Sequence, residues 1–71
     1  MKTYIDKSKL TEQMADKGYK TYASLCRDAG VNVSTFNSVV YQKQSSLNMS
    51  YLLADCLGCH IDDIVSVDWE A

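Results

Sequence analysis

Residues 21–42 read TYASLCRDAGVNVSTFNSVVYQ, and this stretch determines the fold that we expect. Its first half has the i, i+3, i+4, i+7 spacing of one apolar helix face, formed by Tyr22, Leu25, Cys26 and Ala29. Thr21 can cap the start of this helix through its hydroxyl group. Gly30 can adopt the left-handed conformation with which a chain leaves a helix. This half therefore predicts a helix followed by a tight turn.

The second half predicts another helix, VNVSTFNSVVYQK, which either Asn32 or Ser34 can cap. Phe36, with Val39 or Val40, forms its apolar face. The side chains on its other face are short and polar. A small core does not require such a face, and a solvated face usually carries more charge. We therefore interpret this face as a candidate binding surface.

Helices are also predicted on both sides of this stretch. KSKLTEQMADKG places Leu10 and Met14 one turn apart, with Ser8 as a candidate cap and Gly18 as the stop. LNMSYLLADCLG has a regular apolar stripe and ends at Gly58. The residues of that stripe are Met49, Leu52, Leu53, Cys56 and Leu57.

A fifth short helix is expected over residues 61–65. The sequence VSVDWEA follows, and its alternation predicts a short strand or an extended tail with Trp69 packed down. The fold class is therefore all-α, a compact bundle of about five short helices with a short extended C-terminal tail. The chain, residues 1–71, forms a single domain of a size that is marginally stable alone.

The composition agrees with a globular domain, with 46% apolar and 23% charged residues. The absence of proline and the three glycines argue against a disulfide scaffold or an all-β fold. The first twenty residues contain no long apolar run, so we expect a cytoplasmic protein without a membrane segment, whose cysteines stay reduced.

Charge is unevenly distributed along the chain. Residues 1–44 contain all seven Lys and Arg against four acids, whereas residues 45–71 contain five acids and no Lys or Arg. Opposite signs at the two ends suggest that only the first part faces a polyanion. A chance distribution of solvated charges explains the same numbers equally well.

The pentapeptide CLGCH, residues 56–60, has the form of a covalent haem attachment site. Haem attachment requires export, for which no signal is seen, and structural zinc requires four ligands, usually in two pairs. Cys56 lies on the apolar helix stripe, so we interpret the motif mainly as a helix end and expect no cofactor or metal. A regulatory thiol at Cys59 remains open.

The residues around the turn have the spacing of a known DNA-binding motif. They are Leu25 and Cys26 in the first helix, Ala29 and Gly30 at its end, Val31 in the turn, and Phe36 and Val39 in the second helix. This pattern resembles the helix-turn-helix of the Cro and phage-repressor type, the XRE-like family, with Cys26 where alanine is usual. SSLNMSYLLADCLGCHIDDIV is similar to the family's fourth and fifth helices, so the resemblance runs from Leu10 to about Val65 and implies a lambda-repressor-like fold.

The resemblance implies that the second motif helix enters the major groove of DNA. The implied DNA-binding residues are Tyr22, Asn32, Val33, Ser34, Thr35, Asn37, Ser38, Tyr41, Gln42 and Lys43. Asn37 can make two hydrogen bonds to adenine, and Val33 can contact a thymine methyl group. Ser34 and Ser38 can bond a base edge or a phosphate. Phosphates are the better targets for Tyr22, Thr35, Tyr41, Gln42 and Lys43, with Lys20 as a further candidate.

Three of these residues have structural alternatives. Asn32 can serve only as a helix cap, Val33 can belong to the core, and Tyr41 can pack against the fourth helix. The loop YQKQSS after the motif departs from the family pattern, because it lacks Gly and Pro and has a single lysine.

We expect a repressor of bacterial, phage or mobile-element origin that binds a palindromic operator as a homodimer. The dimer surface would use the acidic C-terminal part, including Ile64, Val67 and Trp69, although Trp69 could equally cover the core. No enzyme is expected, since His60 has no nucleophile at motif spacing and no Gly-rich phosphate loop occurs. The low pI of about 5.0 supports an alternative, a helix-turn-helix scaffold that contacts protein, such as an antitoxin or antirepressor. A thiol or metal sensor is a third possibility.

Overall fold

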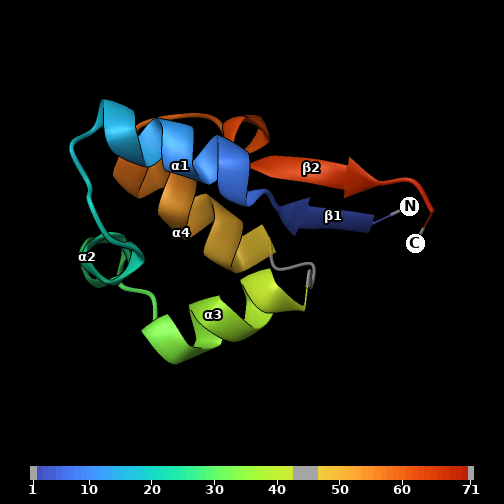
Figure 1. Cartoon of the computed structure of the whole chain (residues 1–71), viewed down its shortest axis with the longest axis horizontal. Coiled ribbons are helices and arrows are strands. Elements are labelled where there is room, and N and C mark those ends of the chain that lie inside the picture. Colours follow the sequence, from blue (N-terminus) through green and yellow to red (C-terminus); the bar gives the residue numbers. More distant parts are fainter. Residues whose placement is uncertain (1, 43–46, 71) are drawn as a thin grey trace.

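The computed structural model describes residues 2–42 and 47–70 (Figure 1). It confirms a compact, mostly helical fold that contains a helix-turn-helix. The elements in chain order are β1 (Lys2–Ile5), α1 (Lys7–Asp16), α2 (Tyr22–Ala29), α3 (Val33–Tyr41), α4 (Leu47–Leu57), the 3₁₀ helix η1 (Ile61–Asp63) and β2 (Val65–Asp68). No helix in the described ranges is long and apolar enough to cross a membrane.

The two ends of the described chain pair as a two-stranded antiparallel sheet, formed by β1 and β2. Lys2 lies opposite Asp68, and Ile5 lies opposite Val65. The strand alternative for the C-terminal tail is therefore confirmed, while its partner β1 was not predicted. Figure 1 shows this pair of strands extending from one end of the helical bundle. The second alternative for the tail is wrong at Trp69, whose side chain is 75% exposed instead of packed down.

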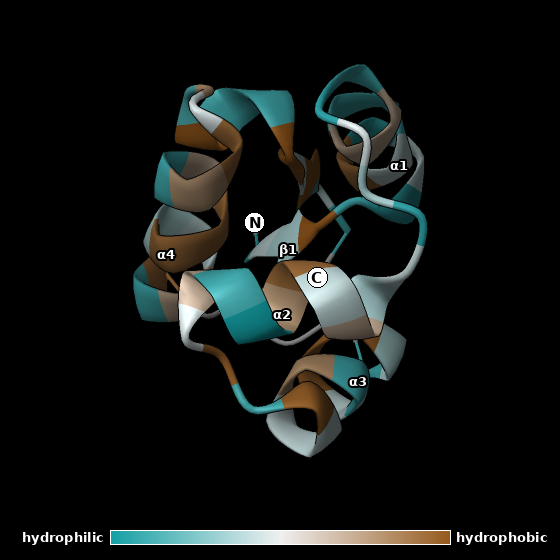
Figure 2. Ribbon diagram, turned by 90° about the vertical axis from the view of Figure 1, so that its left-hand side faces the viewer, coloured by the Kyte–Doolittle hydropathy of each residue, from teal (hydrophilic) through white to brown (hydrophobic). Residues whose placement is uncertain are grey.

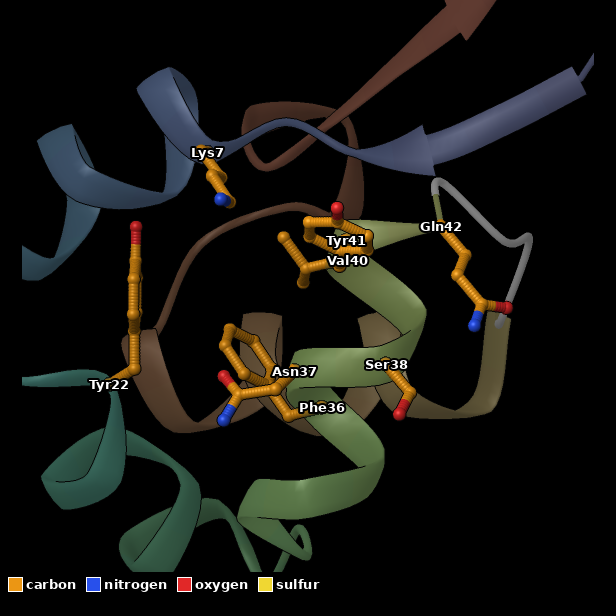
Figure 3. Close-up of a pocket in the computed structure, with 8 residues that line it drawn as sticks. All are labelled: Lys7, Tyr22, Phe36, Asn37, Ser38, Val40, Tyr41 and Gln42. Atoms are coloured by element: carbon orange, nitrogen blue, oxygen red, sulfur yellow. The ribbon is translucent and has the colours of Figure 1, made fainter.

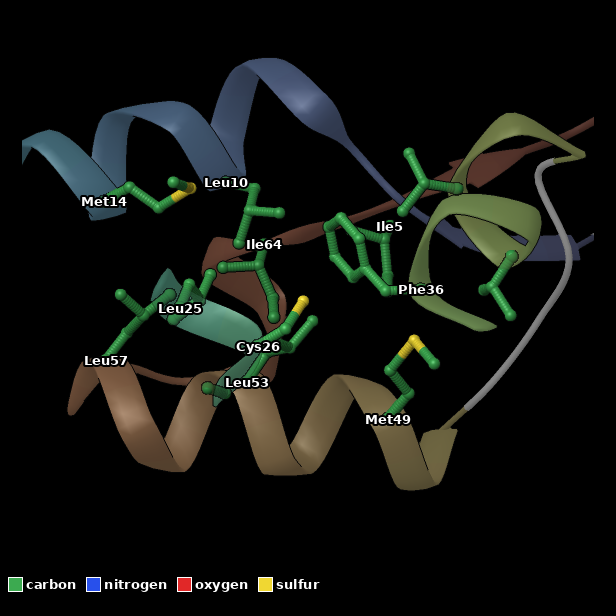
Figure 4. Packing of buried hydrophobic residues seen from close by; sticks show 13 residues of the cluster. Ile5, Leu10, Met14, Leu25, Cys26, Phe36, Met49, Leu53, Leu57 and Ile64 are labelled. Atoms are coloured by element: carbon green, nitrogen blue, oxygen red, sulfur yellow. The ribbon is translucent and has the colours of Figure 1, made fainter. Parts of the chain in front are cut away.

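The core draws side chains from all four α-helices and from both segments that flank them (Figure 4). Its fully buried members include Leu10, Leu25, Cys26, Phe36, Leu53, Leu57 and Ile64. Leu52 was predicted to belong to the buried stripe of α4, but it is 40% exposed. The buried face of α4 instead includes Ser50 and Ala54, so it is rotated about the helix axis from the predicted stripe. The predicted fifth helix is shorter than expected, a single 3₁₀ turn.

Local hydrogen bonds build the helix-turn-helix in the way that the sequence predicts. The Thr21 hydroxyl accepts a hydrogen bond from the Ser24 N–H at 3.2 Å and caps α2. Gly30 ends α2 with φ of 77°, in the left-handed region that favours glycine. Asn32, and not Ser34, caps α3 by accepting from the Thr35 N–H at 3.2 Å.

Asp6 caps α1, so the prediction of Ser8 as the cap is wrong. The Asp6 carboxylate accepts from the Ser8 N–H at 2.9 Å and also from the Ser66 hydroxyl at 2.7 Å. The Ser66 bond joins the start of α1 to β2, which a Ser8 cap could not do. In the same region the Lys9 ammonium donates to the Val65 carbonyl at 2.7 Å. One carboxylate therefore fixes both the helix start and the C-terminal strand.

Replacing Asp6 with Asn is expected to lower the free energy of unfolding at pH 7 by about 0.3–1 kcal/mol, because Asn can still accept the capping hydrogen bonds but lacks the negative charge that favours a helix N-terminus. The hydrogen bond from Ser66 and those from Ser8 and Lys9 hold the pKa of Asp6 below its ordinary value of 3.8. Because the folded pKa is the lower one, this stabilisation is present above about pH 4 and is lost as pH falls toward the folded value. Urea unfolding of the wild type and of Asp6→Asn at pH 7 and pH 2 measures this pH-dependent contribution to the free energy of unfolding.

Asp16→Asn is the control, because Asp16 is an exposed carboxylate at the other end of α1. The difference in stability between the wild type and Asp6→Asn should shrink from pH 7 to pH 2. Equal effects of the two variants at pH 7, or a difference that does not change with pH, would contradict the role given to Asp6.

Candidate nucleic-acid interface

The outer face of α3 carries short, uncharged side chains. Ser34, Asn37 and Ser38 are exposed, while Phe36, Val39 and Val40 on the opposite face are buried. Figure 2 shows α2 and α3 together at one edge of the molecule, where no other element of the described residues covers α3 from outside. A helix placed in this way can enter the major groove, which is about 12 Å wide.

Aromatic packing fixes α3 against α2. The rings of Tyr22 and Phe36 lie with their centroids 5.3 Å apart at an angle of 46°. The Tyr22 hydroxyl lies 3.4 Å from the Thr11 hydroxyl of α1. Tyr22 therefore contacts both α1 and α3, and its position at the start of α2 is the one expected of a residue near a phosphate.

The structure bears on the alternatives for three predicted residues. Asn32 does cap α3, and its side chain is also exposed beside the outer face. Val33 is 37% exposed, so the alternative that it belongs to the core is wrong. Tyr41 is 84% exposed, so the alternative that it packs against α4 is also wrong.

The other predicted residues are placed as follows. Thr35 lies on the flank of α3 nearest α4, and Gln42 follows the last turn of α3. Lys20 is exposed in the segment before α2. Lys43 lies outside the described residues. Apart from Lys20, the structure thus brings the described DNA-binding candidates together around the outer face and two flanks of α3.

A hollow of about 400 Å³ borders one flank of α3 (Figure 3). It is lined by Lys7, Tyr22, Phe36, Asn37, Ser38, Val40, Tyr41 and Gln42. The sequence reasoning missed Lys7, which is far from the motif along the chain and reaches it only through the packing of α1. No local signal in the sequence could have identified it.

A second hollow, of about 260 Å³, borders the other flank of α3. It is lined by Gly30, Val31, Asn32, Thr35, Asn48, Met49 and Leu52. Asn48 was also missed, although its place in the first turn of α4 is visible from the helix prediction. The outer face of α3 therefore lies between a side formed by α1 and α2 and a side formed by α4.

The acidic C-terminal part lies away from α3. Four of its acids, Asp62, Asp63, Asp68 and Glu70, belong to η1, β2 and the residues after β2. Figure 1 shows α3 along the lower edge and β2 across α4 from it. These four carboxylates thus lie away from the polar face of α3, and α3 itself has no carboxylate.

The CLGCH sequence is the end of α4. The helix ends at Leu57, and Gly58 follows with φ of 68°. Burial and the nearby Asp63 carboxylate raise the pKa of the Cys59 thiol, which keeps it protonated and less nucleophilic. Among the described residues there is no group of three or more His, Cys, Asp and Glu side chains that could hold a metal ion.

The capped helices, the glycine turn and the exposed polar helix together define a helix-turn-helix DNA-binding domain. The chain belongs to the family of Cro/C1-type HTH DNA-binding domains, whose family model matches residues 9–69. Searches of the curated proteins and of the solved structures gave no match.

Proposed function

We propose that this DNA-binding regulator recognises a specific duplex sequence by placing α3 in the major groove. The observation that carries the proposal is the outer face of α3, where Ser34, Asn37 and Ser38 are exposed. Asn37 and Ser38 also line one of the two flanking hollows. Side chains of this kind reach base edges without a steric clash, and Asn can bond adenine through two hydrogen bonds. The exposed Val33 suits a thymine methyl group.

The flanks of α3 would hold the DNA backbone. Tyr22 and Tyr41 border one hollow, and Thr35 and Asn32 border the other. Hydroxyl and amide groups in these places can donate to phosphate oxygens and fix the helix in its register. Gln42 follows the last turn of α3, lines the first hollow and would extend the same contact. Lys43 remains a phosphate candidate from its place in the sequence alone.

The regulator would act as a homodimer that represses a promoter by occupying a palindromic operator. A single small domain neutralises few phosphates, and two copies on a two-fold axis double the contact. The C-terminal strand is the candidate dimer surface, because Trp69 is 75% exposed and Val67 is only partly buried. Ile64 is fully buried, so the expectation that it belongs to the dimer surface is wrong.

Selection of bound duplexes from a random pool tests the proposal. The expected result is one enriched sequence with two inverted half-sites, whose centres lie about 10 base pairs apart. The log of the binding constant should fall linearly with the log of the salt concentration. A pool without enrichment after repeated rounds would reject sequence-specific DNA recognition.

One observation favours protein contact as a second function. The solvent side of α4 exposes Leu47 at 57%, Tyr51 at 60% and Leu52 at 40%. An exposed apolar surface of this kind often marks a protein-binding site. In that case binding to DNA would be weak, and the salt slope would be close to zero.

A further inference from the structure

Lys7 has no evident role in the stability of the fold. It is the first residue of α1, where the positive end of the helix dipole disfavours a cation. Among the described residues, its ammonium group has no hydrogen-bond or ion-pair partner. Lys9, two residues further on, differs because it donates to the Val65 carbonyl at 2.7 Å.

The surroundings of Lys7 are those of an anion site. Lys7 and Thr11 lie one turn apart on α1, and the Thr11 hydroxyl is 3.4 Å from the Tyr22 hydroxyl. Lys7 and Tyr22 line the hollow beside α3 together with Asn37 and Tyr41. Figure 3 shows the Lys7 ammonium on the side of the hollow between Tyr22 and Tyr41. The lining contains no Asp or Glu. The nearby Asp6 carboxylate lines an adjoining hollow with Lys7 and Tyr41, but it accepts hydrogen bonds from the Ser8 N–H and the Ser66 hydroxyl instead of pairing with Lys7.

We infer that this hollow binds one phosphate group of the DNA backbone, with Lys7 as its cation and the Tyr22 hydroxyl as a second donor. The inference rests on the proposed function, because the phosphate belongs to the duplex that α3 reads. The sugar-phosphate backbone borders the major groove, so a helix in the groove has phosphates along its flanks. Lys7 lies on such a flank, across the hollow from Asn37 (Figure 3).

This contact gives α1 a positioning role in recognition. Phosphate contacts do not read the sequence, but they fix the register and orientation of the protein on the duplex. Lys7 and the outer face of α3 border the same hollow, so a phosphate held there would fix the rotation of α3 about its own axis. Asn37 would then meet the base edge in a defined orientation.

The test compares Lys7→Gln with Lys17→Gln on the duplex selected from the random pool. Both variants remove one positive charge from an exposed lysine, and Lys17 directly follows the opposite end of α1, near Gly58. For Lys7→Gln the slope of log K against log salt should decrease in magnitude by about 0.9, the value for one phosphate. Lys17→Gln should leave the slope unchanged, and Lys7→Arg should restore it. Binding of Lys7→Gln should weaken by a similar factor on all sequences, because Lys7 contacts no base and the remaining phosphate contacts still hold the register.

Duplexes with a single neutral methylphosphonate identify the phosphate. One backbone position is expected at which neutralisation weakens binding of the wild type but not of Lys7→Gln. Equal slopes for Lys7→Gln and Lys17→Gln, or identical methylphosphonate profiles for wild type and Lys7→Gln, would overturn the inference. If Lys7→Gln binds normally while α3 variants lose binding, the inference alone fails. If the wild type binds no duplex, the proposed function fails with it.

Discussion

Phe36→Ala is expected to leave most of the protein unfolded. Phe36 is 1% exposed, and its ring packs on Tyr22 at a centroid distance of 5.3 Å. Truncation of a buried Phe to Ala costs about 3–5 kcal/mol, because it removes buried apolar surface and leaves a cavity. A small domain has about 0.05–0.15 kcal/mol of stability per residue, so this loss is of the order of the whole stability.

Urea unfolding followed by circular dichroism measures the effect. Tyr41→Ala is the matched control, because it truncates an aromatic side chain in the same helix that is 84% exposed. The control should change the free energy of unfolding by less than about 0.5 kcal/mol. Similar effects of the two substitutions would contradict the assignment of the buried and outer faces of α3.

Asn37→Ala is expected to weaken binding to the selected duplex without lowering the stability of the protein. A bidentate contact to a base contributes about 1–3 kcal/mol of discrimination, which corresponds to roughly a 5- to 150-fold change in affinity. The loss should be accompanied by a relaxed preference at a single base pair in each half-site. Selection and titration with the variant protein measure both quantities.

Asn48→Ala is the control for the loss of an exposed amide. Asn48 is exposed in the first turn of α4 and lies on the other side of α3 from the hollow of Lys7. This substitution should leave the preference at every base pair unchanged, even if it removes a contact to the backbone. Relaxed specificity in Asn48→Ala, with none in Asn37→Ala, would move the reading surface from α3 to α4.

The helix-turn-helix was predictable because short-range interactions build it. Thr21 bonds three residues ahead, Asn32 does the same, and Gly30 supplies the left-handed turn by itself. The buried residues Leu25 and Phe36 also follow directly from helical periodicity. The outer face of α3 could therefore be located as the part of the helix that the core does not use.

Features that depend on contacts distant in the sequence were not predictable. The strand β1 is only four residues long and is defined by its pairing with β2 at the other end of the chain. Asp6 and Ser8 are both residue types that commonly cap helices. Asp6 is bonded to Ser66, which is 60 residues away in the sequence, so only the folded structure distinguishes the two candidates. The position of Lys7 on the flank of α3 was not predictable either, because it depends on how α1 packs in the fold.

The low pI was a weak guide to function, because it averages charges that the fold separates. Asp62 and Asp63 form part of η1, and Asp68 belongs to β2, whereas the outer face of α3 has no carboxylate. An approaching polyanion responds mainly to nearby charges, because the Debye length at physiological salt is about 8 Å. A net charge of −2 is therefore compatible with DNA binding through α3.

Amide chemical-shift mapping with the selected duplex tests the central claim, that the outer face of α3 is the DNA-reading surface. Titration of the duplex into labelled protein should shift the amide signals of Ser34, Asn37 and Ser38 in a saturable manner and leave that of Tyr51 on α4 nearly unchanged. Shifts centred on Tyr51 and Leu52, with the signals of α3 unaffected, would contradict the account.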